Sequence, residues 1–180
     1  MTDKENTFLP ESHVLRYPTR VFSAASPAGH FWPFDSEPKN IYIAASMDNQ
    51  QAALRLAFLL GRASLNVTSS WLSVDAATSN CNYDVSPQDV ADMQRSAGLR
   101  DIEDLEKADT LVVLNDIEST TGGLHFEVGY FLGRGRTNVL IVNGRRDNVF
   151  FHLSPVRWLD EVTNFGEVVD KLTATRKVAP

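Results

Sequence analysis

Short apolar runs alternate with longer segments of helical periodicity from residue 40 onward. Runs of strand length predict buried strands at residues 41–45, 65–71, 110–114 and 138–142. Segments with helical spacing of apolar residues predict helices at 51–62, 87–108, 124–133 and 165–174, with Gly98 as a candidate break in the second. Ser86 and Pro87 are the cap and first-turn residues that open such a helix.

This alternation predicts an α/β fold: a doubly wound, flavodoxin-like parallel sheet of about five strands with helices on both faces. The run at 110–114 is the most uniformly apolar and is expected at the centre of the sheet. In such folds ligands bind beyond the carboxyl ends of the strands. The candidate site therefore lies among residues 44–47, 69–73, 115–121 and 143–148.

Residues 1–38 differ from the rest of the chain. They hold five of the eight prolines and an aromatic cluster at 30–34, and they lack clear periodicity. We interpret them as an N-terminal extension that lies against a domain formed by residues 39–180; a disordered tail is the alternative for residues 1–12.

Composition narrows the class of protein. The 180 residues are 43% hydrophobic, which suits one domain with its own core. The single cysteine, Cys81, excludes an internal disulfide, and neither a signal peptide nor a membrane span is expected, so we predict a cytoplasmic protein. A net charge of -6 argues against binding to a nucleic acid polymer, but a nucleotide phosphate can be held by backbone amides alone.

One acid interrupts an apolar helix. Glu127 follows the predicted strand at 110–114 and its loop, and Gly122 and Gly123 allow a ligand to approach the backbone closely. The amino end of the helix favours an ionised carboxylate. The simpler explanation is a first-turn acid that only satisfies the helix dipole, and position alone leaves both open.

Other candidates also have ordinary explanations. The acids of 101–109 mostly suit a solvated helix face, although one of them can point along the end of the sheet. Tyr42 is typical of a strand core, Trp71 of either base stacking or core, and Ser46 and Thr121 of turns. The four histidines have no metal-site spacing, and neither metal nor cofactor is expected.

Three blocks in this order resemble a known family: IYIAAS, DIEDLEKADTLVVL and GGLHFEVGYFLGRGRTNVLIV. From about residue 40 to 160 the chain resembles the nucleoside 2-deoxyribosyltransferase superfamily, which includes deoxyribonucleoside 5'-monophosphate N-glycosidases. The resemblance implies an enzyme that cleaves the N-glycosidic bond of a nucleoside or nucleotide, by hydrolysis or by base transfer. A non-catalytic nucleotide-binding or sensing module that uses the same cleft is the alternative.

The resemblance also implies roles for single residues. Glu127 matches the nucleophile, Tyr42 the tyrosine that orients it, and Asp101 an aspartate that protonates or holds the base. Thr121 stands where the transferases carry a sugar-binding aspartate and the monophosphate hydrolases a serine, so the chain departs from the transferase pattern.

The resemblance further implies that a neighbouring subunit completes the site, with Asn148 as the nearest candidate. The apolar tract at 149–151 also suggests a covered surface. A homodimer or higher homo-oligomer is therefore expected.

Overall fold

The computed structural model describes residues 34, 36–73, 86–115, 122–144, 149–152 and 156–174. The chain divides between Phe31 and Trp32, and every described residue belongs to the second unit. The predicted extension at 1–38 lies almost wholly outside the described residues, so its boundary with the domain stays a prediction.

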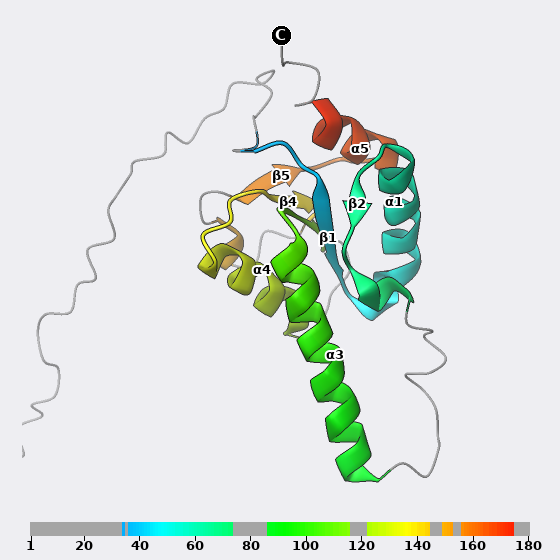
Figure 1. The fold of residues 1–180 in the computed structure, drawn as a ribbon. Coiled ribbons are helices and arrows are strands. Elements are labelled where there is room, and N and C mark those ends of the chain that lie inside the picture. Colours follow the sequence, from blue (N-terminus) through cyan, green and yellow to red (C-terminus); the bar gives the residue numbers. More distant parts are fainter. Residues whose placement is uncertain are drawn as a thin grey trace, which may run out of the picture. The chain divides into compact units, whose positions relative to one another are not determined.

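A parallel sheet of five strands forms the centre of the fold (Figure 1). The strands are β1 (Asn40–Ala45), β2 (Asn66–Val67), β3 (Thr110–Leu114), β4 (Val139–Val142) and β5 (Val156–Leu159). Their order across the sheet is β2-β1-β3-β4-β5, and every neighbouring pair is parallel. This is the flavodoxin-like arrangement. The predicted fold class and the central place of residues 110–114 are confirmed.

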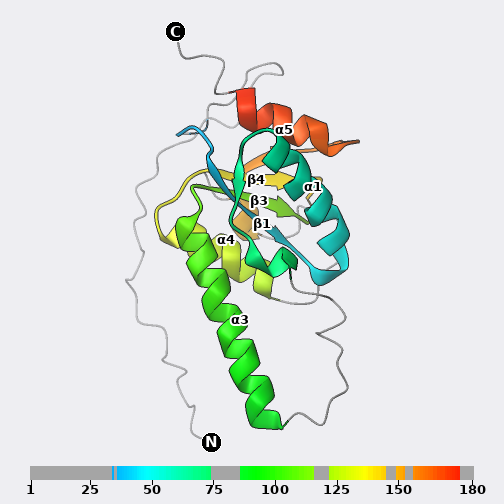
Figure 2. The ribbon, with the colours of Figure 1, turned by 45° about the vertical axis from the view of Figure 1, so that its right-hand side comes forward.

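Helices cover both faces of the sheet (Figure 2). Helices α1 (Gln50–Arg62) and α5 (Phe165–Thr173) pack on one face, and α3 (Pro87–Lys107) and α4 (Gly123–Gly133) on the other. Because strand side chains alternate between faces, Ile41 and Ile43 belong to the core under α1, while Tyr42 and Ala44 face α3 and α4. Short 3-10 turns complete the described elements: η1 (Met47–Asn49), η2 (Ser70–Ser73) and η3 (Val149–His152).

Strand β2 is much shorter than the run predicted at 65–71. Beyond the end of β2, the side chains of Ser69 and Trp71 form hydrogen bonds with backbone groups of β1 that a longer β2 would otherwise pair. The hydroxyl of Ser69 accepts from the backbone N–H of Ile43 at 2.6 Å, and the indole Nε1 of Trp71 donates to the Ile43 carbonyl at 2.9 Å. Side-chain bonds of this kind compete with a ladder, and the chain turns into η2.

Two further elements differ from the sequence prediction. Strand β5 was not predicted, and α3 runs unbroken through Gly98. The cap of α3 is as predicted, because the Ser86 hydroxyl accepts from the backbone N–H of Asp89 at 3.2 Å. All described residues from 86 to 100 are exposed, and Figures 1 and 2 show this half of α3 projecting beyond the sheet.

The end of the predicted extension joins the domain core where it is described. Phe34 is 6% exposed and packs with the core under α1, and the guanidinium of Arg157 lies 5.1 Å from the centre of its ring. The side-chain amide of Asn138 donates to the Ser36 hydroxyl at 2.9 Å. These contacts fasten the chain just before β1.

Candidate active site

A hydrogen bond joins the middle of β1 to α4. Tyr42 is fully buried and its hydroxyl donates to Oε1 of Glu127 at 2.8 Å. Tyr42 points to the α3–α4 face because of its place in the strand alternation, and Glu127 is the fifth residue of α4. The acid that interrupts this helix therefore has a specific partner in the core, and it is half-buried.

Glu127 is not held ionised in the way that the helix argument suggests. Burial raises its pKa from an ordinary value of 4.5 to about 7, and the negative charge of Asp101 adds to this. The hydrogen bond from Tyr42 works in the opposite direction, because it stabilises the charged form. A pKa near neutrality suits a group which must gain and lose negative charge.

Asp101 lies on α3 within electrostatic range of both residues. It is half-buried, and burial and the charge of Asp104 raise its pKa, while Arg100 lowers it. Burial is the largest cause of the raised pKa of Tyr42, followed by the charges of Glu127 and Asp101. The structure therefore brings the three residues together on one face of the sheet. Whether they share one pocket stays a prediction, because residues 74–85, 116–121 and 145–148 lie outside the described residues.

A second acid of α3, Asp104, makes contacts that the sequence analysis did not assign. Its side chain is almost fully buried; Oδ2 accepts from the backbone N–H of Ser70 at 2.8 Å, and Oδ1 from the Lys107 ammonium at 3.1 Å. Burial alone would raise the pKa of Asp104, but these bonds outweigh burial and hold the pKa below its usual range. Its spacing of three from Asp101 places both on one helix face, which is the sequence signal that was available.

The predicted substrate-binding residues are placed as follows. Ser46 follows β1, and its hydroxyl is buried without a hydrogen-bond partner among the described residues, so it has bonding capacity to offer. Trp71 uses its indole N–H on β1 and is half-buried between the two cores. Gly122 and Gly123 begin α4 in the open, and a methyl group at either would meet nothing within 4 Å. Thr121 and Asn148 lie outside the described residues.

The apolar tract at 149–151 is partly explained within the chain. Phe151 is 1% exposed, stacks on His125 with ring centres 5.4 Å apart, and meets Trp158 edge-on. It therefore belongs to the core of this chain and supplies no exposed apolar surface. The predicted oligomer stays a prediction.

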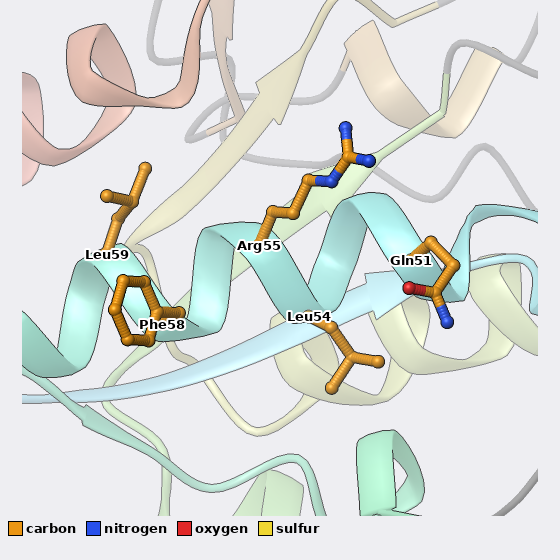
Figure 3. A pocket seen from close by; sticks show the side chains of 5 residues that line it. All are labelled: Gln51, Leu54, Arg55, Phe58 and Leu59. Atoms are coloured by element: carbon orange, nitrogen blue, oxygen red, sulfur yellow. The ribbon is translucent and has the colours of Figure 1, made fainter.

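Two pockets lie away from Glu127. One, of about 430 Å³, runs along the outer side of α1, where Figure 3 shows Leu54, Arg55 and Phe58 pointing outward. The other, of about 410 Å³, lies where Ser36, Asp109 and Asn138 meet, at the amino ends of β1, β3 and β4. Neither is lined by any of the predicted site residues.

No helix in the described ranges has the length and apolar character needed to cross a membrane. Within the same part of the chain, no three acidic, histidine or cysteine side chains are grouped so as to hold a metal ion.

The chain resembles solved structures, whereas no family model and no curated protein matches it. A 2-deoxyribosyltransferase from Bacillus psychrosaccharolyticus superposes with a TM-score of 0.50 at 14% identity, over 73% of this chain and 90% of the other. The chain shares the fold of that enzyme. A CMP N-glycosidase, BcmB, from Clostridium botulinum matches with a TM-score of 0.47 and 16% identity over 76% and 99% of the two chains. A conserved protein from Enterococcus faecalis V583 matches with a TM-score of 0.49 and 13% identity, over 76% of this chain and 98% of the other. At 14% identity the likeness to the Bacillus enzyme is one of fold.

Proposed function

We propose that the protein cleaves the N-glycosidic bond of a deoxynucleoside or its 5'-monophosphate, with Glu127 as the nucleophile. The observation that carries this proposal is the 2.8 Å hydrogen bond from the buried Tyr42 hydroxyl to Glu127. A nucleophile must be held in a fixed orientation, and a buried tyrosine whose hydroxyl donates to the carboxylate provides this. The motif that contains Glu127 and the shared fold support the same assignment.

The proposed first step replaces the bond to the base by a bond to the enzyme. Oε2 of Glu127, the oxygen not bonded to Tyr42, attacks the anomeric carbon of the sugar. The carbon–nitrogen bond breaks, and its electron pair leaves with the base. Positive charge that builds on the sugar during this step is stabilised by the carboxylate beside it.

Asp101 is proposed to assist the leaving base. Its raised pKa keeps a larger share of the carboxyl protonated than an exposed aspartate would have, so it can donate a proton or a hydrogen bond to the base nitrogen. In the second step water, or a second base, attacks the same carbon from the side opposite the glutamyl ester and gives a proton to the Asp101 carboxylate. Glu127 is released as a carboxylate, and the configuration at the carbon is retained overall.

The 5'-monophosphate is the substrate form that we favour. Gly122 caps α4, and the amides at this helix start can hold a phosphate without a lysine or arginine. By the family resemblance, Thr121 replaces the aspartate of the transferases, and that aspartate would repel the phosphate. The Ser46 hydroxyl at the end of β1, which has no partner in the described part of the chain, offers a further contact to the sugar or the base.

The test is incubation of the purified protein with a panel of deoxynucleosides and their 5'-monophosphates, with free base measured by liquid chromatography. Release of base, and its loss in Glu127→Gln, is the expected result. Adding a second free base separates transfer from hydrolysis, because transfer yields a new nucleoside. Binding of nucleotides with no base released from any substrate would reject the proposal and identify a nucleotide-binding module.

A further inference from the structure

The face of α3 that packs on the sheet carries a carboxylate which touches neither Tyr42 nor Glu127 and which the proposed chemistry leaves unused. Asp104 is 5% exposed, and it lies three positions after Asp101 on this face. A buried carboxylate is costly unless its oxygens are bonded. Both oxygens of Asp104 are bonded, one to Ser70 and one to Lys107.

These bonds tie α3 to the turn that borders β1. Ser70 begins η2, and the neighbouring Ser69 and Trp71 are fastened to the backbone of Ile43, next to Tyr42. The position of α3 relative to β1 therefore depends in part on the Asp104–Ser70 contact. Asp101 is carried by the same turn of α3.

We propose that Asp104 is a positioning residue of the proposed glycosidase site: its bonds to Ser70 and Lys107 hold α3 on η2 and fix a negative charge on the helix face that carries Asp101. This inference rests on the proposed function for its catalytic meaning. Lys107 balances the charge only in part, because its side chain is 62% exposed and surrounded by solvent.

The charges that face this pair act in a consistent way. The charge of Asp104 raises the pKa of Asp101, and Arg100 opposes it. From β1 and α4 the pair faces Tyr42 and Glu127, whose own pKa values are raised by the charge of Asp101. An ionised Asp101 beside Glu127 would hinder the nucleophile, so a nearby charge that keeps Asp101 protonated serves both groups.

Asp104→Asn is the decisive variant, since asparagine can still accept from the Ser70 N–H but carries no charge. Carbon-13 NMR of labelled aspartate carboxyls follows the titration of Asp101 in the folded protein, with Asp101→Asn used to assign its signal. We expect the pKa of Asp101 to fall in Asp104→Asn. In Lys107→Met, which removes the partial counter-charge, we expect it to rise. An unchanged titration in Asp104→Asn, or a fall in both variants, would overturn the proposal.

Kinetics give a second and separate readout. We expect kcat/KM at neutral pH to fall about threefold to tenfold in Asp104→Asn, because fewer molecules hold Asp101 protonated while Glu127 is ionised. The same substitution made on top of Asp101→Asn should have no further effect on kcat/KM, whereas a purely structural role would reduce activity in both backgrounds. If Asp104→Asn does not fold, Asp104→Glu and Asp104→Gln form a pair that differs only in charge.

The two proposals fail in different ways. If the Asp101 titration moves as expected but no substrate releases base, the charge arrangement stands and the glycosidase function is wrong. If base is released but neither the titration nor the double variant behaves as expected, the function stands and the role of Asp104 is wrong.

Discussion

The Tyr42 hydroxyl and the Glu127 carboxylate are 85 positions apart in the sequence and 2.8 Å apart in the fold. One comes from a core strand and the other from the helix that follows the central strand of the sheet. Glu127→Gln keeps the size of the side chain and an oxygen that can accept from Tyr42, but it removes the nucleophile. We expect base release to fall by at least about a thousandfold, measured by liquid chromatography under single-turnover conditions. Glu103→Gln, an exposed acid of α3, is the matched control and should retain activity.

Tyr42→Phe removes only the hydroxyl from this pair. The hydrogen bond from Tyr42 lowers the pKa of Glu127, so its loss should raise that pKa further above 7. The acid limb of the pH profile of kcat/KM should move to higher pH, and the rate at neutral pH should fall about tenfold to a hundredfold. A limb that stays in place would mean that the hydroxyl does not act on the ionisation of Glu127.

Stability should depend on pH through Glu127. Its pKa is about 7 in the folded protein and 4.5 in its ordinary state, so the folded protein holds this proton more tightly than the unfolded chain. The stabilisation is therefore complete below pH 4.5 and is lost as the pH rises towards 7 and slightly beyond, by up to about 3 kcal/mol. Denaturant unfolding of the parent protein and Glu127→Gln at pH 5 and pH 8 measures this. The free energy of unfolding of the variant should rise relative to that of the parent from pH 5 to pH 8. The same difference between the two proteins at both pH values would contradict a raised pKa of Glu127 in the folded state.

Ser69→Ala should destabilise the fold more than its small size suggests. The Ser69 hydroxyl accepts from the N–H of Ile43 and also donates to the Ile43 carbonyl at 3.3 Å, and both residues are buried. We expect a loss of about 1–3 kcal/mol in the free energy of unfolding, measured with urea. Ser73→Ala removes a bond of similar length within the exposed part of η2 and should change it by less than about 0.5 kcal/mol.

Thr121→Asp tests the preference for a phosphate. An added carboxylate at this position should repel the phosphate near the start of α4, so kcat/KM for monophosphates should fall about tenfold or more relative to nucleosides. Thr121→Ser, the residue found in monophosphate hydrolases of the resembling family, should keep the ratio of the two substrates. An equal loss for both substrates would remove the phosphate assignment and leave the role of Glu127 in place.

The strands that the sequence predicts well are those that are buried on both faces. The runs of β1, β3 and β4 are continuous and apolar because helices cover both sides of them. Strand β5 lies at the edge, and its Arg157 and Trp158 break the apolar pattern. Both are half-buried in the fold, where Arg157 lies against Phe34 and Trp158 meets Phe151 edge-on. Phe34 is more than 100 residues away in the sequence, and no local pattern contains that contact.

The site was predictable only in part and for a different reason. No periodicity connects Tyr42 with Glu127; the family resemblance named both, and the fold brings them together. Asp104 was one of several acids in a charged segment, and its burial depends on the turn of η2 that meets it. That turn forms because the side chains of Ser69 and Trp71 bond to β1 and end β2. The strand propensity of residues 65–71 does not predict these bonds.

The two halves of α3 should differ in local stability, because only the second half packs on the sheet. From Asp104 onward the helix is locked to the sheet, whereas residues 86–100 are exposed and depend on their own backbone bonds. An isolated helical segment of that length is only marginally stable in water. Its amide hydrogens should therefore exchange with deuterium by local fraying, long before the global unfolding that releases those of Asp104 and Leu105. A protease should likewise cut the first half of α3 in the native protein and spare the second, so that α3 is one helix in its geometry and two in its dynamics.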